Sequence, residues 1–157
     1  MKFSIGSDQE HVVRDANGNL KSAIGIVNGS KEAKLDLGDG VSVFFDNVMA
    51  ECNIKPAYSK KEFIENIRIC TQKYAKNIRP NVLCIESSAT YPDAELEHDE
   101  AWKFACTPDF CAYDLIQREP PVCDPNTIGG FRSAGRHIHL SGEGHPFNTD
   151  MGKINVI

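Results

Sequence analysis

The sequence has no excess of basic residues and no long apolar run. Its 157 residues include 17 Lys and Arg against 22 Asp and Glu, which gives a formal net charge of -5. Proteins that bind nucleic acid through a basic surface carry the opposite balance. A membrane-spanning helix needs about 20 consecutive apolar residues, and no segment approaches that length. We therefore expect neither nucleic acid nor a membrane as a partner.

The features of a secreted or zinc-stabilised domain are also missing. The N-terminus has one basic residue, Lys2, and reaches Asp8 and Glu10 before any apolar block, so no signal peptide is predicted. The six cysteines form no C-x-x-C pair, which disfavours a zinc ribbon. No phosphate-binding loop of the form G-x-x-x-x-G-K is present. We expect a cytoplasmic protein whose cysteines are reduced.

Turn residues divide much of the chain into predicted strands. The Asn-Gly pair at residues 17–18 lies between the apolar segments 12–13 and 24–27, a pattern typical of a hairpin. Glycines at 38 and 40 predict a second turn before the β-branched and aromatic segment 41–45. Further strands are expected over 48–54 and 82–85. The proline-rich segment 104–130 is expected to be an irregular connection.

One long helix is predicted over residues 60–78. Ser59 and Glu62 form a capping-box pattern, and Pro80 ends the run. Apolar side chains recur at helical spacing at Phe63, Ile64, Ile67, Cys70, Tyr74 and Ile78. The expected fold is α+β, a curved and mostly antiparallel sheet with this helix packed on one face.

Two histidines carry the sharpest chemical signal. His137 and His139 alternate along the predicted strand 132–141, so they lie on one face and can reach one ligand. The alternative is a strand with two hydrogen-bonded histidines, and the pair alone favours it. Asp8, Glu10 and Glu51 also lie in predicted strands. Carboxylates with a minority of imidazoles suit magnesium better than zinc, although spacing does not show that these side chains meet.

Four segments of the chain resemble one enzyme family. They are residues 6–15 (GSDQEHVVRD), 46–57 (DNVMAECNIKPA), 107–110 (TPDF) and 132–139 (RSAGRHIH). Their order and separations are similar to those of the phage-type carboxylate-amine ligases, the amidoligases of the second type. This family resembles the glutamine synthetase and glutamate-cysteine ligase superfamily. The resemblance extends from about residue 4 to residue 142, and the second and fourth segments are the specific ones.

The resemblance implies metal and nucleotide sites. Glu10 and Glu51 would hold one magnesium ion, and Asp8 and His137 would hold the other. ATP would be the second cofactor. The site is expected on the concave side of the sheet.

The resemblance also implies the reaction, which is ATP-dependent amide formation from a small-molecule or peptide carboxylate and an amine. The carboxylate takes the terminal phosphoryl group to give an acyl phosphate, because oxide is a poor leaving group, and the amine then displaces phosphate. Two metal ions would spread the charge of the transferring group. His139 and Ser141 would lie near the phosphates, and Arg132 would be a catalytic anion contact.

The chain departs from the family pattern after the histidine strand. Family members usually continue with more sheet, another carboxylate ligand and phosphate-contacting arginines, whereas this sequence ends at Ile157. Residues 1–157 are therefore expected to form one amidoligase-like domain without that C-terminal half. Lys153 is the single basic residue after His139, which leaves Arg132 and Arg136 for the triphosphate. A homo-oligomer or a second polypeptide would complete the site.

Two further interpretations stay open beside the ligase. A phage structural or interaction protein would keep the half-fold without catalysis, since a fold does not secure a function; it would act in the host cytoplasm or in the virion. The chain would otherwise be a fragment of a longer ligase. Convergence of Glu10, Glu51 and His137 favours a retained metal site, and separation by more than about 10 Å disfavours one.

Overall fold

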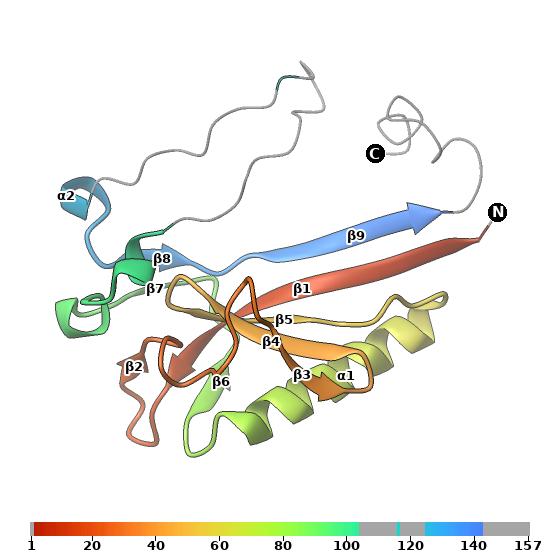
Figure 1. Ribbon diagram of the computed structural model, residues 1–157, viewed down its shortest axis with the longest axis horizontal. Coiled ribbons are helices and arrows are strands. Elements are labelled where there is room, and N and C mark those ends of the chain that lie inside the picture. The colour runs from red at the N-terminus through yellow and green to blue at the C-terminus, as the bar shows by residue number, and fades with distance from the viewer. Residues whose placement is uncertain (1, 104–115, 117–124, 143–157) are drawn as a thin grey trace.

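The computed structural model describes residues 2–103, 116 and 125–142. The fold is α+β, as expected, with a curled antiparallel half-barrel sheet and one long helix on one side of it (Figure 1). The main sheet consists of β1 (Phe3–Arg14), β2 (Leu20–Lys21), β3 (Leu35–Gly38), β4 (Val41–Asp46), β5 (Met49–Asn53), β6 (Val82–Cys84) and β9 (Arg136–Gly142). The other elements are α1 (Lys60–Asn77), β7 (Ser88–Thr90), η1 (Asp93–Glu95), η2 (Asp99–Trp102), α2 (Pro125–Ile128) and β8 (Phe131–Ser133).

The long first strand, β1, organises the main sheet. The strand order is β2-β1-β5-β4-β3, and β6 and β9 also pair with β1. Strand β9 pairs with residues 3–9, whereas β2 and β6 pair with the other end of β1, near Arg14. All of these pairings are antiparallel. Strand β1 therefore lies between β5 on one side and β9 on the other (Figure 1). It carries Asp8 and Glu10, and β9 carries the two histidines.

Helix α1 forms because its sequence supplies both a cap and an apolar row. The Ser59 hydroxyl accepts a hydrogen bond from the backbone N–H of Glu62 at 3.2 Å, and the Glu62 carboxylate accepts one from the N–H of Tyr58 at 2.8 Å. Cys70 and Tyr74 are fully buried beneath the sheet. The helix is thereby fixed against β4, β5 and β6.

Alternation along the strands divides the apolar core between the two faces of the sheet. The face toward α1 buries Val13, Val43 and Cys52. The opposite face buries a smaller group that includes Val12 and Met49. Successive residues of one strand, such as Val12 and Val13, therefore contribute to different cores.

The predicted elements are confirmed, with two corrections. The first hairpin is present and turns at Gly18, whose φ is 84°, but its second strand is β2 and not residues 24–27. The predicted strand 132–141 is instead two strands, β8 and β9, which belong to different sheets. On α1, Ile64 is 54% exposed. The buried row of α1 runs through Asn66, Cys70 and Tyr74, four residues apart. The Asn66 side chain donates to the carbonyl of Lys55 at 3.1 Å, which satisfies the buried amide.

Some predictions fall outside the described residues. These are the family segment 107–110, most of the irregular connection 104–130 and the cysteines at 106, 111 and 123. The described cysteines, Cys52, Cys70 and Cys84, are free thiols. Among residues 2–103 and 125–142, no helix has the length and apolar character needed to cross a membrane.

Candidate metal centre

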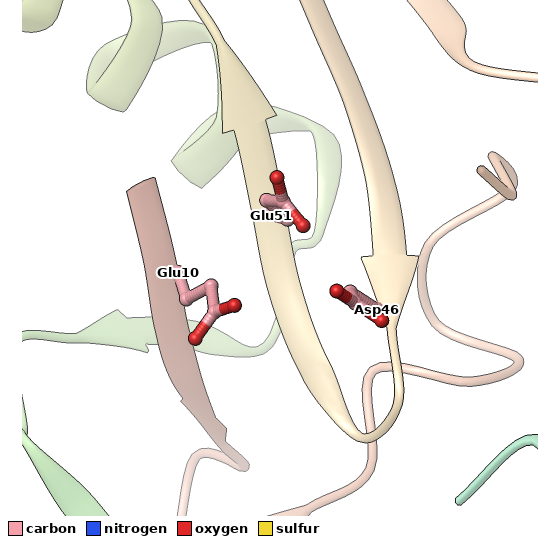
Figure 2. Close-up of side chains that lie close together, drawn as sticks. All are labelled: Glu10, Asp46 and Glu51. Carbon is pink, nitrogen blue, oxygen red and sulfur yellow. The ribbon is translucent and has the colours of Figure 1, made fainter. Parts of the chain in front are cut away.

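Three carboxylates from three neighbouring strands converge on the sheet face opposite α1. Glu10 lies on β1, Glu51 on the central strand β5 and Asp46 at the end of β4 (Figure 2). Each offers one carboxylate oxygen, and these oxygens all lie within 4.8 Å of one another. We call these three residues the acidic cluster. Their spacing is compatible with one divalent cation, whose ligands lie about 2.0 to 2.6 Å from the ion.

Strand register explains why the acidic cluster forms. Glu10 lies directly opposite Glu51 in the pairing of β1 with β5, and Phe44 lies opposite Glu51 in the pairing of β4 with β5. Asp46 follows Phe44 by two residues and so shares its face. The turn from β4 to β5 begins at Asn47, whose φ of 56° is a conformation that asparagine tolerates. The hairpin therefore returns Asp46 to the side of Glu51.

Glu51 is the most unusual member of the acidic cluster. It is only 8% exposed, yet no residue in the described part of the chain donates a hydrogen bond to its carboxylate or forms an ion pair with it. Burial, followed by the charges of Asp46, Glu10 and Asp8, raises the pKa of Glu51 to about 8. A buried carboxylate without donors is costly unless it is protonated or faces a cation.

The other two members of the acidic cluster have partners. Glu10 Oε2 accepts a hydrogen bond from the backbone N–H of Gly135 at 2.5 Å. Burial raises the pKa of Glu10, and the hydrogen bond from Gly135 opposes that rise. Asp46 Oδ2 lies 2.6 Å from Lys31 Nζ in an ion pair. Within residues 2–103 and 125–142, Glu10 and Glu51 form no ion pair, so Lys31 compensates the negative charge of the cluster only in part.

A second group of polar side chains lies beside the acidic cluster on the same face. Asp8 is opposite His137 in the pairing of β1 with β9, and Gly6 is opposite His139. Asp8 Oδ1 lies 2.9 Å from His139 Nε2 and 3.6 Å from His137 Nδ1. The prediction that both histidines share one face is confirmed. Both imidazoles are mostly exposed, whereas the Asp8 side chain is only 19% exposed.

The acidic cluster, together with Asp8 and His137, lines one shallow pocket of about 280 Å³. Its walls are Asp8, Glu10, Lys31, Lys34, Phe44, Asp46, Glu51, Asn53 and His137. The structure thus brings Glu10 close to Glu51, and Asp8 close to His137, in the pairs that the family resemblance implies. Their roles as metal ligands stay predictions.

Arg132 lies in a different environment. It is 2% exposed, and its guanidinium carbon is 4.7 Å from the centre of the Trp102 ring. Its Nε donates to Asn47 Oδ1 at 3.1 Å. The terminal nitrogens donate at 2.8 to 3.0 Å to the backbone carbonyls of Ala101, Gly129 and Phe131. These contacts join β8 to the surrounding loops, and they lend no support to a catalytic anion contact.

Ser141 and Arg136 also lie apart from the acidic cluster. Ser141 is opposite Ser4, and the path along β1 from Ser4 to Glu10 is roughly 20 Å long. Arg136 is opposite Gln9 and therefore belongs to the face toward α1. Neither residue is positioned at the pocket.

The sequence predictions missed three charged pocket residues, Asp46, Lys31 and Lys34. Asp46 had a signal, because a strand over 41–46 that turns at Asn47 places it on the same face as Glu51. The two lysines lie between predicted strands, in a polar segment where lysine is common. Only the tertiary structure brings them to the pocket.

Comparison with known proteins identifies no relative. No protein-family model, curated protein or solved structure matches the chain. The resemblance to the amidoligases therefore stays a prediction that rests on the four sequence segments.

Proposed function

We propose that the pocket opposite α1 binds magnesium and supports ATP-dependent ligation of a carboxylate to an amine. The observation that carries the proposal is Glu51, which is nine-tenths buried, faces two other carboxylates and has no donor among the described residues. Buried charges in proteins are normally paired or bound to a metal ion. A cation held by Glu51, Glu10 and Asp46 would supply that compensation.

The two groups of proposed metal ligands suit one hard cation with a second cation beside it. The acidic cluster offers oxygen atoms only, which is the ligand type that magnesium prefers. Asp8 and His137, whose side chains approach to 3.6 Å, would hold the second ion. His139 contacts the same carboxylate at 2.9 Å and would lie close to a bound phosphate.

Magnesium in such a site stabilises the charge of a phosphoryl group during transfer. In the proposed reaction, a substrate carboxylate oxygen attacks the terminal phosphorus of ATP, the bond to ADP breaks, and an acyl phosphate forms. An amine then attacks the acyl carbon, phosphate leaves, and the nitrogen loses a proton to solvent. The substrates would be small molecules or peptides, and the cytoplasm is the proposed compartment because it supplies ATP.

A structural or interaction protein that keeps this fold without catalysis is the second candidate function. The placement of the basic residues favours it, because Arg132 is engaged in the loops around β8 and Arg136 belongs to the other face. Phosphoryl transfer requires cations around the phosphates. If the chain is a ligase, a second copy or another polypeptide would supply some of them.

Isothermal titration with magnesium and a non-hydrolysable ATP analogue tests the proposal. We expect saturable, magnesium-dependent nucleotide binding by the wild-type chain. Glu51→Gln and His137→Ala should each weaken it by about tenfold or more, because each removes a proposed ligand. Glu65→Gln is the matched control, since it changes an exposed carboxylate on α1 that pairs with Arg68.

Two results would reject this proposal. The first is an absence of binding at millimolar ligand by wild-type protein that circular dichroism and urea unfolding show to be folded. That result would favour the structural or interaction role. The second is binding that Glu51→Gln and His137→Ala leave unchanged, which would locate the nucleotide outside this pocket.

A further inference from the structure

Two lysines from one turn face the carboxylates of the pocket. Lys31 and Lys34 lie between Gly29 and the start of β3, and both line the same pocket as the acidic cluster. A group of carboxylates attracts cations, whereas two ammonium groups beside it attract anions. The pocket therefore offers complementary charge to a ligand that combines a metal ion with an anion.

The turn that carries these lysines is fixed against β4. The carbonyl of Gly29 accepts a hydrogen bond from the N–H of Phe45 at 3.0 Å. Ser30 and Ala33 close the turn, with a backbone hydrogen bond from Ser30 N to Ala33 O at 3.0 Å. A Cβ atom at position 29 would lie 2.3 Å from the carbonyl oxygen of Val43, so glycine is required for this approach. The lysines thus project from a defined backbone.

Lys34 holds its charge at the pocket without an acidic partner. Its Nζ lies 2.6 Å from Asn53 Oδ1 and 4.3 Å from the centre of the Phe44 ring. Both are neutral groups that position an ammonium ion without cancelling its charge. Among the residues described in the structure, Lys34 forms no ion pair, although four carboxylates line the same pocket.

Lys31 is linked to the proposed metal site through Asp46. Its Nζ lies 2.6 Å from Asp46 Oδ2. A divalent cation held by Asp46 would compete with Lys31 for this carboxylate, because both attract the same negative charge. Metal binding at the acidic cluster would thereby release the Lys31 ammonium group toward an anion.

We propose that residues 29–34 form an oxyanion clamp, in which Lys34 and Lys31 bind phosphate oxygens of a polyphosphate ligand over the acidic cluster. Lysine ammonium groups bind phosphate as point charges, and they would occupy the role that the sequence assigned to arginines. This inference rests on the proposed function, since the clamp engages an anion that a divalent cation brings to the pocket.

Two consecutive titrations test the clamp, first with magnesium alone and then with tripolyphosphate at saturating magnesium. Lys34→Gln should change the magnesium affinity by less than about twofold. It should weaken tripolyphosphate binding about tenfold, because it removes a charged contact. Lys31→Gln should raise magnesium affinity about threefold and still weaken tripolyphosphate, because Asp46 loses a competing cation. Lys34→Arg, which keeps the charge, should restore most of the binding. Lys61→Gln, at an exposed position of α1, is the control.

The outcomes separate the clamp from the metal site. Tripolyphosphate affinity that is unchanged in both Lys34→Gln and Lys31→Gln, with magnesium binding intact, would overturn the clamp and leave the metal site standing. A dicarboxylate, titrated at saturating magnesium in the same way, serves as a second anion probe. If the two lysine variants lose dicarboxylate binding but keep tripolyphosphate binding, the clamp is also overturned, because the anion would then be a carboxylate. A folded wild-type chain that does not bind magnesium would overturn both proposals.

Discussion

The two faces of the main sheet differ in what the same strands bury. On the side of α1, Val13 and Cys52 are fully buried among apolar side chains. On the other side, β1 and β5 present Glu10 and Glu51, and the carboxylate of Glu51 is buried without a described donor. Burial of apolar surface stabilises the fold, whereas burial of a carboxylate opposes folding. One face therefore provides the stability that allows the other to hold an unfavourable arrangement of charge.

The largest expected effect is on the α1 face. Tyr74 is fully buried, and its hydroxyl donates to the carbonyl of Phe44 at 3.2 Å. Tyr74→Ala should lower the free energy of unfolding by about 3–5 kcal/mol, as large aromatic truncations do. Ile64→Ala, at a 54% exposed position of the same helix, should change it by less than about 0.5 kcal/mol. Urea unfolding measures both, and equal losses would contradict the assignment of the buried row.

On the opposite face, substitution of Glu51 should raise the free energy of unfolding instead of lowering it. The pKa of Glu51 is raised from 4.5 to about 8, so between these values the folded state keeps a proton that the unfolded state has lost. Stability from this group is fully present below pH 4.5 and is lost as the pH rises through 8. Glutamine cannot lose this proton, so Glu51→Gln does not lose stability in this way. The free energy of unfolding of the variant, relative to that of wild type, should therefore increase by roughly 2–4 kcal/mol between pH 4 and pH 9.

Urea unfolding of wild type and Glu51→Gln in the presence of a chelator checks this prediction. The variant Glu65→Gln controls for the loss of a carboxylate, because Glu65 is exposed and pairs with Arg68 on α1. A stability difference between wild type and Glu51→Gln that does not vary with pH would show that Glu51 titrates normally. The contrast between the two faces would then lose its energetic basis.

Substitution of Arg132 tests whether this buried arginine stabilises the fold or contacts the nucleotide. Arg132→Gln should lower the free energy of unfolding by about 2–3 kcal/mol, because its hydrogen bonds to Asn47 and to three carbonyls are lost. The exposed Arg136→Gln should be nearly neutral. Nucleotide affinity, measured where the variant is folded, should be unchanged. A tenfold loss of nucleotide affinity with unchanged stability would restore the catalytic role that the sequence suggested.

Local signals explain which parts of the structure the sequence predicted. The Ser59 cap and Pro80 define α1 within a few residues, and glycines mark the turns. The alternation of His137 and His139 places both on one face without knowledge of the partner strand.

Partners distant in the sequence explain the remainder. Asp46 joins the acidic cluster through the register of β4 with β5. Arg132 contacts Asn47, Ala101 and Trp102, which lie far from it in the chain. Lys31 and Lys34 reach the pocket through the contact of their turn with β4. The sequence shows which residues of one strand share a face, but it does not show the register between two strands.

The smallest expected effect concerns protons, and it connects the energetics of the two faces to the proposed function. If magnesium binds Glu51, it must displace the proton that this residue keeps below a pKa of about 8. Magnesium affinity should then rise about tenfold, or about 1.4 kcal/mol, between pH 6.5 and pH 7.5. Titrations at pH 7 in buffers of different ionisation enthalpy should report nearly one proton released per ion bound. Binding without proton release would mean that the ion avoids Glu51.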